Sequence, residues 1–164
     1  MHITSINNEY IKEISKLNEK KYRDKSNKYL IEGLHLVTEA LKYDIIDTII
    51  IREDFSYETD IKHIIVSNEV MKKLSDNPSI PKIMAIVYKK ESTISGNKIL
   101  LLDRLQDPGN LGTIIRSAVA FNFDTIILSN DTVDLYNSKV LRSTQGMLFN
   151  INILRQDLTN VINE

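Results

Sequence analysis

Apolar residues recur at helical spacing in the first part of the chain. In residues 9–20, Ile11, Ile14 and Leu17 fall on one face, which predicts a helix. Residues 20–28 are polar and basic and have no apolar period, so we expect a loop there. A short strand over residues 29–32 is predicted next, followed by Gly33 and an amphipathic helix that ends near Asp44.

Short apolar runs at residues 48–51, 63–66 and 83–88 predict buried strands. Ser67 is a suitable N-cap for a helix between the last two of them, because its hydroxyl can accept a backbone N–H. Asn77, Pro78 and Pro81 then favour a turn. Residues 1–92 are therefore predicted to form one small domain of layered helices and strands.

The polar stretch at residues 89–97 predicts a linker, with a domain boundary near Ser92. In residues 93–164 predicted strands (98–103, 125–129, 148–154) alternate with predicted helices (110–121, and 137–145 ending at Gly146). Such alternation is typical of parallel βαβ units with helices that cover a sheet. Asp157 is expected to cap one further helix.

Composition narrows the classes of function. The 21 basic and 22 acidic side chains nearly cancel, so any site for a polyanion must be local. There is no cysteine, which excludes disulfides and thiolate chemistry, and no apolar run is long enough for a membrane helix. The histidines (His2, His35, His63) are far apart, so we expect no metal site. These features favour a cytoplasmic protein.

The turn Asp107-Pro108-Gly109-Asn110 follows a predicted buried strand and begins a predicted helix. Pro108 fixes its φ angle, Gly109 permits a positive φ, and Asn110 can cap the helix and offer its amide. Ligands bind at the carboxyl ends of strands in open α/β sheets, and the N–H groups of a helix start favour anions. The turn is therefore a candidate phosphate or ribose site.

Within this helix, periodicity places one set of residues toward the core (Leu111, Ile114, Ile115, Ala118, Val119) and another away from it (Gly112, Thr113, Arg116, Ser117). Gly112 would let a ligand backbone approach the helix, and the Arg116 guanidinium could then bind a phosphate. We expect Asn110 and Arg116 to face one hollow. Turn and cap chemistry with a solvated arginine would also account for most of these residues. Neither the dinucleotide fingerprint nor the NTPase phosphate loop occurs.

A second candidate site is the basic stretch itself. Lysines and an arginine alternate there with Tyr22 and Tyr29, a combination that can neutralise phosphates and stack on bases, as RNA binding requires. The basic residues are Lys20, Lys21, Arg23, Lys25 and Lys28. Lys139 and Arg142 could add positive charge near the first site. A solvated surface loop and an ordinary polar helix face are the alternatives.

The pattern Asp107-Pro-x-Asn110-x-Gly112-x-x-x-Arg116 closely resembles the first motif of the SpoU/TrmH family of RNA ribose 2′-O-methyltransferases. The resemblance continues through Lys139-Val-Leu-Arg-Ser-Thr-Gln-Gly146. The N-terminal part is similar to the substrate-binding domain of that family, which itself resembles the L30e/L7Ae ribosomal proteins, and Ser5, Asn7, Lys12, Leu17 and Leu30-Ile-Glu-Gly33 fit it. The resemblance thus covers nearly the whole chain.

The resemblance implies a small L30e-like α/β/α domain followed by a Rossmann-like parallel-sheet domain of the SPOUT (α/β knot) class. It implies that Asn110 shapes the catalytic site and that Arg116 contacts the phosphate of the target nucleotide, with Gly112 and Arg142 near the RNA. The reaction would be methyl transfer from S-adenosylmethionine to a ribose 2′-oxygen of ribosomal or transfer RNA. Because a guanidinium is a poor base, electrostatic stabilisation of the developing alkoxide is the safer role for Arg116.

Members of this family continue into a glutamate-containing motif and a Ser-Leu-Asn-type motif, which form the knot that binds S-adenosylmethionine and most of the homodimer interface. Neither motif occurs before Glu164. We therefore expect a truncated domain that lacks its C-terminal knot, binds cofactor poorly by itself, and leaves its cofactor-binding residues unknown. Two alternatives stay open: a non-catalytic RNA-binding module, and a binder of small anions at Asn110.

Overall fold

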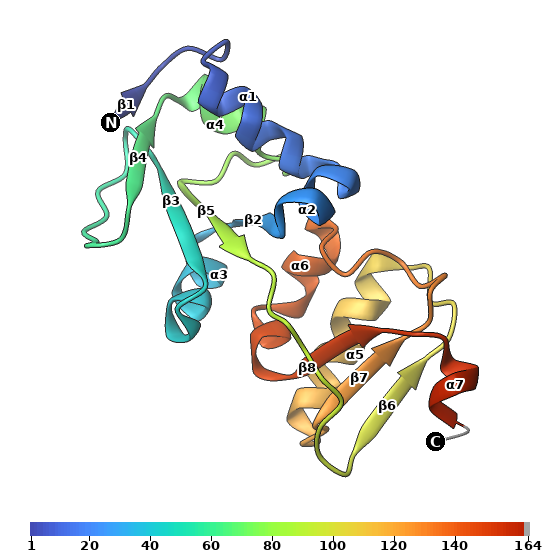
Figure 1. Ribbon diagram of the computed structural model, residues 1–164. Helices are drawn as coiled ribbons and strands as arrows, with labels where there is room; N and C mark the ends of the chain where they lie inside the picture. Colours follow the sequence, from blue (N-terminus) through green and yellow to red (C-terminus); the bar gives the residue numbers. More distant parts are fainter. Residues whose placement is uncertain (163–164) are drawn as a thin grey trace. The chain divides into compact units, whose positions relative to one another are not determined.

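The computed structural model describes residues 1–162, and the chain divides into two compact units, Met1–Lys89 and Lys90–Glu164 (Figure 1). The break after Lys89 lies at the start of the polar stretch that the sequence marks as a linker.

The first unit is built on a mixed sheet with the strand order β1-β4-β3-β5-β2. Its strands are β1 (His2–Ile3), β2 (Lys28–Glu32), β3 (Ile46–Arg52), β4 (His63–Val66) and β5 (Ile83–Tyr88). β1, β4 and β3 are parallel, whereas β5 is antiparallel to both β3 and β2. The predicted strands at residues 29–32, 48–51, 63–66 and 83–88 are confirmed, and β1 was not predicted because only two residues form it.

Helices cover both faces of this sheet. α1 (Glu9–Ser15) and α4 (Asn68–Leu74) lie beside one another on one face (Figure 1), where Ile11, Val70 and Met84 belong to one buried cluster. α3 (Leu34–Ala40) continues into the 3-10 turn η2 (Leu41–Tyr43) and contacts β5. Successive strand residues point to opposite faces, which explains why nearly every residue of β5 is buried. The predicted α/β/α architecture is confirmed.

The prediction of a loop over residues 20–28 is wrong. Lys20–Ser26 form the helix α2, which ends where Asn27 adopts a left-handed conformation with φ of 55°. Only Arg23 is buried in this helix, so no apolar period marks it, although lysine and arginine are good helix formers. The predicted helix over residues 9–20 is also divided, since α1 ends at Ser15 and Lys16–Asn18 form the 3-10 turn η1.

The second unit contains a parallel sheet with the strand order β6-β7-β8. Its elements are β6 (Ile99–Leu102), α5 (Pro108–Ala120), β7 (Thr125–Leu128), α6 (Ser138–Thr144), η3 (Met147–Asn150), β8 (Asn152–Arg155) and α7 (Leu158–Ile162). α5 and α6 pack against one another (Figure 1), and all four residues of the central strand β7 are buried. The predicted parallel βαβ arrangement is confirmed.

The predicted strand over residues 148–154 begins later than expected. Gln145 and Gly146 both have positive φ angles, and the chain then forms the 3-10 turn η3, in which the Phe149 N–H donates to the Gly146 carbonyl at 3.1 Å. Leu148 and Phe149 are buried, but they belong to this turn and not to a strand. Their apolar character therefore predicted the wrong type of element. Asp157 accepts the N–H of Thr159 at 2.9 Å and caps α7 as predicted.

Candidate functional site

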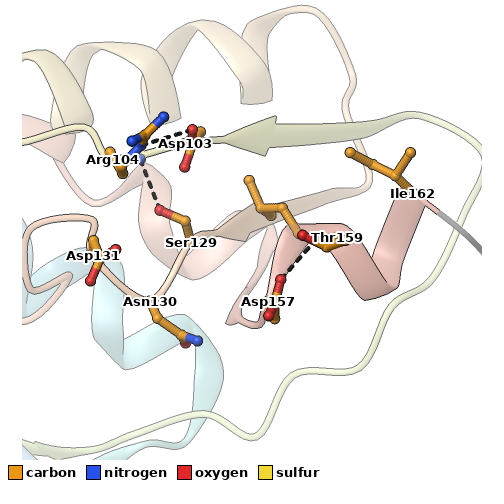
Figure 2. A pocket seen from close by; sticks show the side chains of 9 residues that line it. Asp103, Arg104, Ser129, Asn130, Asp131, Asp157, Thr159 and Ile162 are labelled. Carbon is orange, nitrogen blue, oxygen red and sulfur yellow. Dashed lines mark hydrogen bonds and ion pairs between the residues drawn. The ribbon is translucent and has the colours of Figure 1, made fainter.

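The loops that follow β6 and β7 are hydrogen-bonded to each other at the carboxyl edge of the parallel sheet. The Ser129 Oγ accepts the backbone N–H of Arg104 at 2.8 Å (Figure 2), and the Gln106 Nε2 donates to the Asp131 carbonyl at 2.6 Å. Arg104 has a φ of 49°, a left-handed conformation that sharpens the turn. The loop that leads into α5 is therefore held by its neighbour and is not a free segment.

Arg155, at the end of β8, fixes the loop after β7. Its Nη1 donates to the carbonyl oxygens of Ser129, Asn130 and Thr132 at 2.7, 2.9 and 2.8 Å, and its Nη2 donates to that of Val133 at 3.0 Å. A guanidinium carries five donors in a fixed fork, so one side chain can satisfy a whole curved loop. Sequence analysis missed this residue because no local motif links a strand-end arginine to carbonyls more than 20 residues away.

A hollow of about 470 Å³ opens at this edge of the sheet (Figure 2). Its polar walls are Asp103, Arg104, Ser129, Asn130, Asp131, Asp157 and Thr159, and Leu158 and Ile162 supply apolar surface. Neither Asn110 nor Arg116 is among these residues. The hollow contains three carboxylates and one guanidinium, so its local charge suits a cationic ligand better than a phosphate.

The helix start differs from the prediction in two respects. Asp107, not Asn110, is the N-cap of α5, and its Oδ1 accepts the N–H of Asn110 at 2.7 Å. Pro108 is therefore the first helical residue, a position that proline favours. Gly109 lies within the first turn and is not among the residues with positive φ. Capping by Asp107 leaves the Asn110 side chain exposed, with no hydrogen bond to residues 1–162.

Arg116 is exposed on α5, and among the described residues it forms neither an ion pair nor a hydrogen bond. It follows Asn110 by six residues, which corresponds to about 9 Å along the helix axis and about 120° around it. That both side chains face one hollow stays a prediction. The two groups lie on adjoining sides of one helix, where a single RNA strand that crosses α5 could contact both.

Gly112 is buried, contrary to the prediction of an open glycine on the ligand side. A Cβ atom at this position would lie 2.3 Å from the Cβ and 2.8 Å from the carbonyl carbon of Ser143 on α6. The missing side chain thus allows two helices to approach each other and not a ligand to approach the chain. Thr113 and Ser117 are exposed as expected, and their hydroxyls donate to backbone carbonyls one turn earlier.

Arg142 and Lys139 lie on α6, in the turn that meets Gly112 through Ser143. Lys139 is exposed, and Arg142 is partly buried. The Nη1 of Arg142 is buried and has no hydrogen-bond partner among the described residues. Buried polar atoms in native proteins are nearly always paired with protein groups or ordered water, so we expect a water molecule or another group from outside residues 1–162 to accept from this nitrogen.

The predicted basic residues of the first unit have different environments. Lys20 and Lys21 are exposed but paired with Asp24 at 2.9 Å and Glu19 at 3.1 Å. Lys25 is exposed and has no ion pair among residues 1–162. The Nη1 of Arg23 donates to two backbone carbonyls in a buried position, so this arginine stabilises the fold.

Lys28 belongs to a small network at the ends of β2, β3 and β5. Its Nζ donates to the Asp47 Oδ1 at 2.8 Å, and the Tyr88 hydroxyl donates to the same oxygen at 2.7 Å. Burial acts to raise the pKa of Asp47, but the hydrogen bonds from Lys28, Tyr88 and Thr48 outweigh it and lower the pKa to about 2. The charge of Lys28 is therefore largely neutralised within the protein.

No group of three or more metal-ligating side chains occurs within residues 1–162. In the same part of the chain, no helix has the length and apolar content needed to cross a bilayer.

Comparison with known proteins identifies the two units separately. Residues 8–85 match the MRM3-like substrate binding domain, and residues 97–164 match the SpoU rRNA Methylase family. The 23S rRNA (guanosine(2553)-2′-O)-methyltransferase RlmP of Bacillus subtilis is 38% identical over 99% of this chain. The chain belongs to the SpoU rRNA methylase family. The human mitochondrial rRNA methyltransferase 3 is more distant, at 31% identity over 81% of this chain.

Solved structures of SpoU relatives have the same fold. The AdoMet-bound rRNA methyltransferase from Sinorhizobium meliloti superposes with a TM-score of 0.85 at 29% identity. An RNA 2′-O ribose methyltransferase superposes with a TM-score of 0.82 at 30% identity. This chain covers 67% and 68% of those two chains, 68% of RlmP and 36% of the human protein.

S-Adenosylmethionine is the cofactor of the SpoU family, as the AdoMet-bound relative illustrates. The aspartates of the hollow in Figure 2 match the positive charges of its sulfonium and amino groups. The lining residues include neither an aromatic ring nor a glycine, so nothing encloses an adenine. The described residues fit the cofactor in charge alone, and no catalytic step is assigned to the hollow.

Proposed function

We propose that this chain is the RNA-binding and ribose-positioning part of an S-adenosylmethionine-dependent rRNA 2′-O-methyltransferase. The observation that carries the proposal is the state of Arg116, which stands exposed on α5 without an internal counter-ion. An arginine that served only the fold would be expected to resemble Arg155, whose guanidinium is used by four carbonyls. Membership of the SpoU family supports the same assignment.

The role of Arg116 is electrostatic. Its cationic guanidinium can hold a phosphate of the target nucleotide in a forked contact and stabilise negative charge as it develops on the 2′-oxygen. S-Adenosylmethionine, when bound, supplies an electrophilic methyl group on sulfur. Arg142, with an unsatisfied buried nitrogen, and Lys139 add positive charge for the same strand. Positioning of the hydroxyl supplies much of the rate enhancement.

Asn110 is proposed to shape the site beside Arg116. Its carboxamide is not used to cap α5, since Asp107 performs that task, so it remains free to bind the ribose or its phosphate. Gly112 contributes indirectly, because it sets the distance between α5 and α6. The exposed lysines of α2, above all Lys25, are proposed to bind the RNA backbone.

The proposal includes ribosomal RNA as the substrate, a homodimer as the active assembly and the cytoplasm as the location. The names of the Bacillus subtilis and human relatives support ribosomal RNA. The proposed location follows the Bacillus subtilis relative, whose substrate is the 23S rRNA of a bacterial cell. The non-catalytic RNA-binding module is not favoured, because the relatives of this chain are named as methyltransferases.

Methyl transfer tests the proposal. The protein expressed from its complete reading frame is incubated with tritiated S-adenosylmethionine and 23S rRNA transcripts, and label in the RNA is measured. We expect Arg116→Ala to reduce transfer by at least about 100-fold, as removal of an electrostatic stabiliser does in other enzymes. Ser117→Ala, on the same helix, is the matched control and should leave transfer unchanged. Wild-type transfer by the Arg116→Ala variant contradicts the proposal.

A further inference from the structure

A second hollow, of about 320 Å³, lies within the first unit. Two sets of residues at helical i, i+3, i+4 spacing line it: Glu13, Lys16 and Leu17 from α1 and η1, and Tyr22, Lys25 and Ser26 from α2. Residues at this spacing share one helix face. The volume is within the range of about 300–1,000 Å³ that is typical of small-ligand sites. The basic helix α2 thus forms one wall of a defined cavity.

The walls of this hollow are fixed by hydrogen bonds that range from buried to exposed. The Nη1 of Arg23 donates to the carbonyl oxygens of Leu17 and Asn18, each at 2.8 Å, and so joins α2 to η1. The Ser26 hydroxyl donates to the Tyr22 carbonyl at 2.8 Å, within α2 itself. Hydrogen bonds to a charged donor are stronger than neutral ones. A ligand would therefore enter a preformed site and would not have to order it.

The hollow has a net charge of one positive unit. Glu13 and Lys16 form an ion pair at 2.5 Å and cancel each other, whereas Lys25 has no such partner within residues 1–162. One phosphodiester of RNA carries one negative charge. The positive charge of Lys25 therefore balances the negative charge of one phosphate at the rim of the hollow.

Tyr22 provides an aromatic surface inside the hollow. Its ring is partly buried, and the Nζ atoms of Lys21 and Lys16 lie over the ring, 4.7 and 5.8 Å from its centroid, so a base that stacks on that side takes the place of these ammonium groups. An aromatic ring beside lysines is the arrangement on which single-stranded nucleic acids stack their bases. Leu17 adds an apolar contact beside the ring. Bases in a duplex are already stacked and could not enter.

We propose that this hollow binds one unpaired nucleotide of the RNA, with its base stacked on Tyr22 and its phosphate held by Lys25. The inference rests on the proposed function, since it assumes an RNA partner, and it specifies which form of RNA the first unit selects. The substrate would thus be recognised at a single-stranded loop or bulge and not along a helix.

The test measures binding of the whole chain to a fluorescein-labelled single-stranded RNA of eight nucleotides and to the matching blunt duplex by fluorescence anisotropy. Tyr22→Leu and Lys25→Gln should each weaken single-strand binding by about fivefold or more, because stacking on one aromatic ring and one phosphate contact are lost. Tyr22→Phe keeps the ring and should bind like wild type. Lys72→Gln removes an exposed lysine from α4 and serves as the matched control. Equal effects on the duplex and the single strand would overturn the proposal.

A second variant reports stacking directly. The chain contains no tryptophan, so Tyr22→Trp introduces a single tryptophan into the hollow, which can be excited separately from the remaining tyrosines. Quenching of its emission by the single strand but not by the duplex is expected, and unchanged emission at saturation would contradict the proposal. The two proposals fail in different experiments. Normal RNA binding by Tyr22→Leu would refute this inference, whereas normal methyl transfer by Arg116→Ala would refute the proposed function.

Discussion

Gly112 and Ser143 lie in direct contact where α5 and α6 cross. A Cβ atom on Gly112 would be 2.3 Å from the Ser143 Cβ and 2.8 Å from its carbonyl carbon, so any side chain at this position requires the helices to move. Arg116 lies one turn along α5 from this contact, and Arg142 is the neighbour of Ser143. The contact therefore sets the spacing between the cationic groups that are proposed to hold the RNA.

Gly112→Ala should destabilise the second unit. Overpacking against a backbone carbon costs about 1–3 kcal/mol, and the higher helix propensity of alanine returns at most about 1 kcal/mol. We expect a net loss of about 1–2 kcal/mol in the free energy of unfolding, measured by urea denaturation. RNA affinity should fall as well, because α5 and α6 are displaced.

Gly109→Ala provides the matched control on the same helix. Its Cβ would meet only the Asp107 Oδ1, at 3.1 Å, and its φ angle is not positive. Alanine is a better helix former than glycine by at most about 1 kcal/mol, and the tight contact with the capping Asp107 offsets part of this gain, so stability should stay close to that of the wild type. Equal stability of the two variants would show that α5 and α6 separate without cost and that the glycine is not needed for packing.

Most elements of the fold could be predicted because their signals are local. Apolar runs marked β4 and β5, Ser67 marked the start of α4, and Gly146 marked the end of α6. The errors occurred where the signal is absent or ambiguous. α2 buries only Arg23 and therefore shows no period, and the apolar residues of η3 look like part of a strand.

The candidate site was harder to predict because its decisive contacts join distant segments. The sequence placed Arg116 on an exposed face of α5, as observed, and placed Gly112 on that face too, which is wrong. The role of Gly112 depends on its contact with Ser143, which is 31 residues away. No local sequence pattern predicts this contact. Arg155 was missed for the same reason, since its acceptors are carbonyls of another loop.

The stability of the first unit should depend on pH through Asp47. Its pKa is lowered to about 2 in the folded protein, whereas an unfolded aspartate has a pKa of about 3.9. The carboxylate thus contributes stability above about pH 4, and this contribution is lost as the pH falls toward 2. We expect Asp47→Asn to cost about 1–2 kcal/mol at pH 7 and almost nothing near pH 2. Urea unfolding of both proteins from pH 7 to 2.5 measures the difference, and a difference that is constant with pH would refute the assignment.

Arg155→Met should loosen the loop that follows β7. Methionine keeps part of the hydrocarbon stem but leaves the carbonyls of Ser129, Asn130, Thr132 and Val133 without their donor. Loss of charged hydrogen bonds to partly buried acceptors costs about 2–4 kcal/mol. We expect a lower free energy of unfolding and faster amide hydrogen exchange at residues 129–133. Wild-type exchange there would show that other contacts hold the loop.

Arg142→Met should weaken RNA binding without lowering stability, in contrast to Arg155→Met. The Nη1 of Arg142 is buried without a partner among residues 1–162, and such an atom costs about 1–3 kcal/mol, so its removal should leave stability unchanged or raise it. RNA affinity should decrease, and the slope of log K against log salt should fall by about 0.7–0.9 for one lost phosphate contact. Thermal unfolding and RNA binding at several salt concentrations test the two effects separately. A less stable variant with an unchanged salt slope would assign the guanidinium to the fold, because the nitrogen would then have found its partner inside the protein.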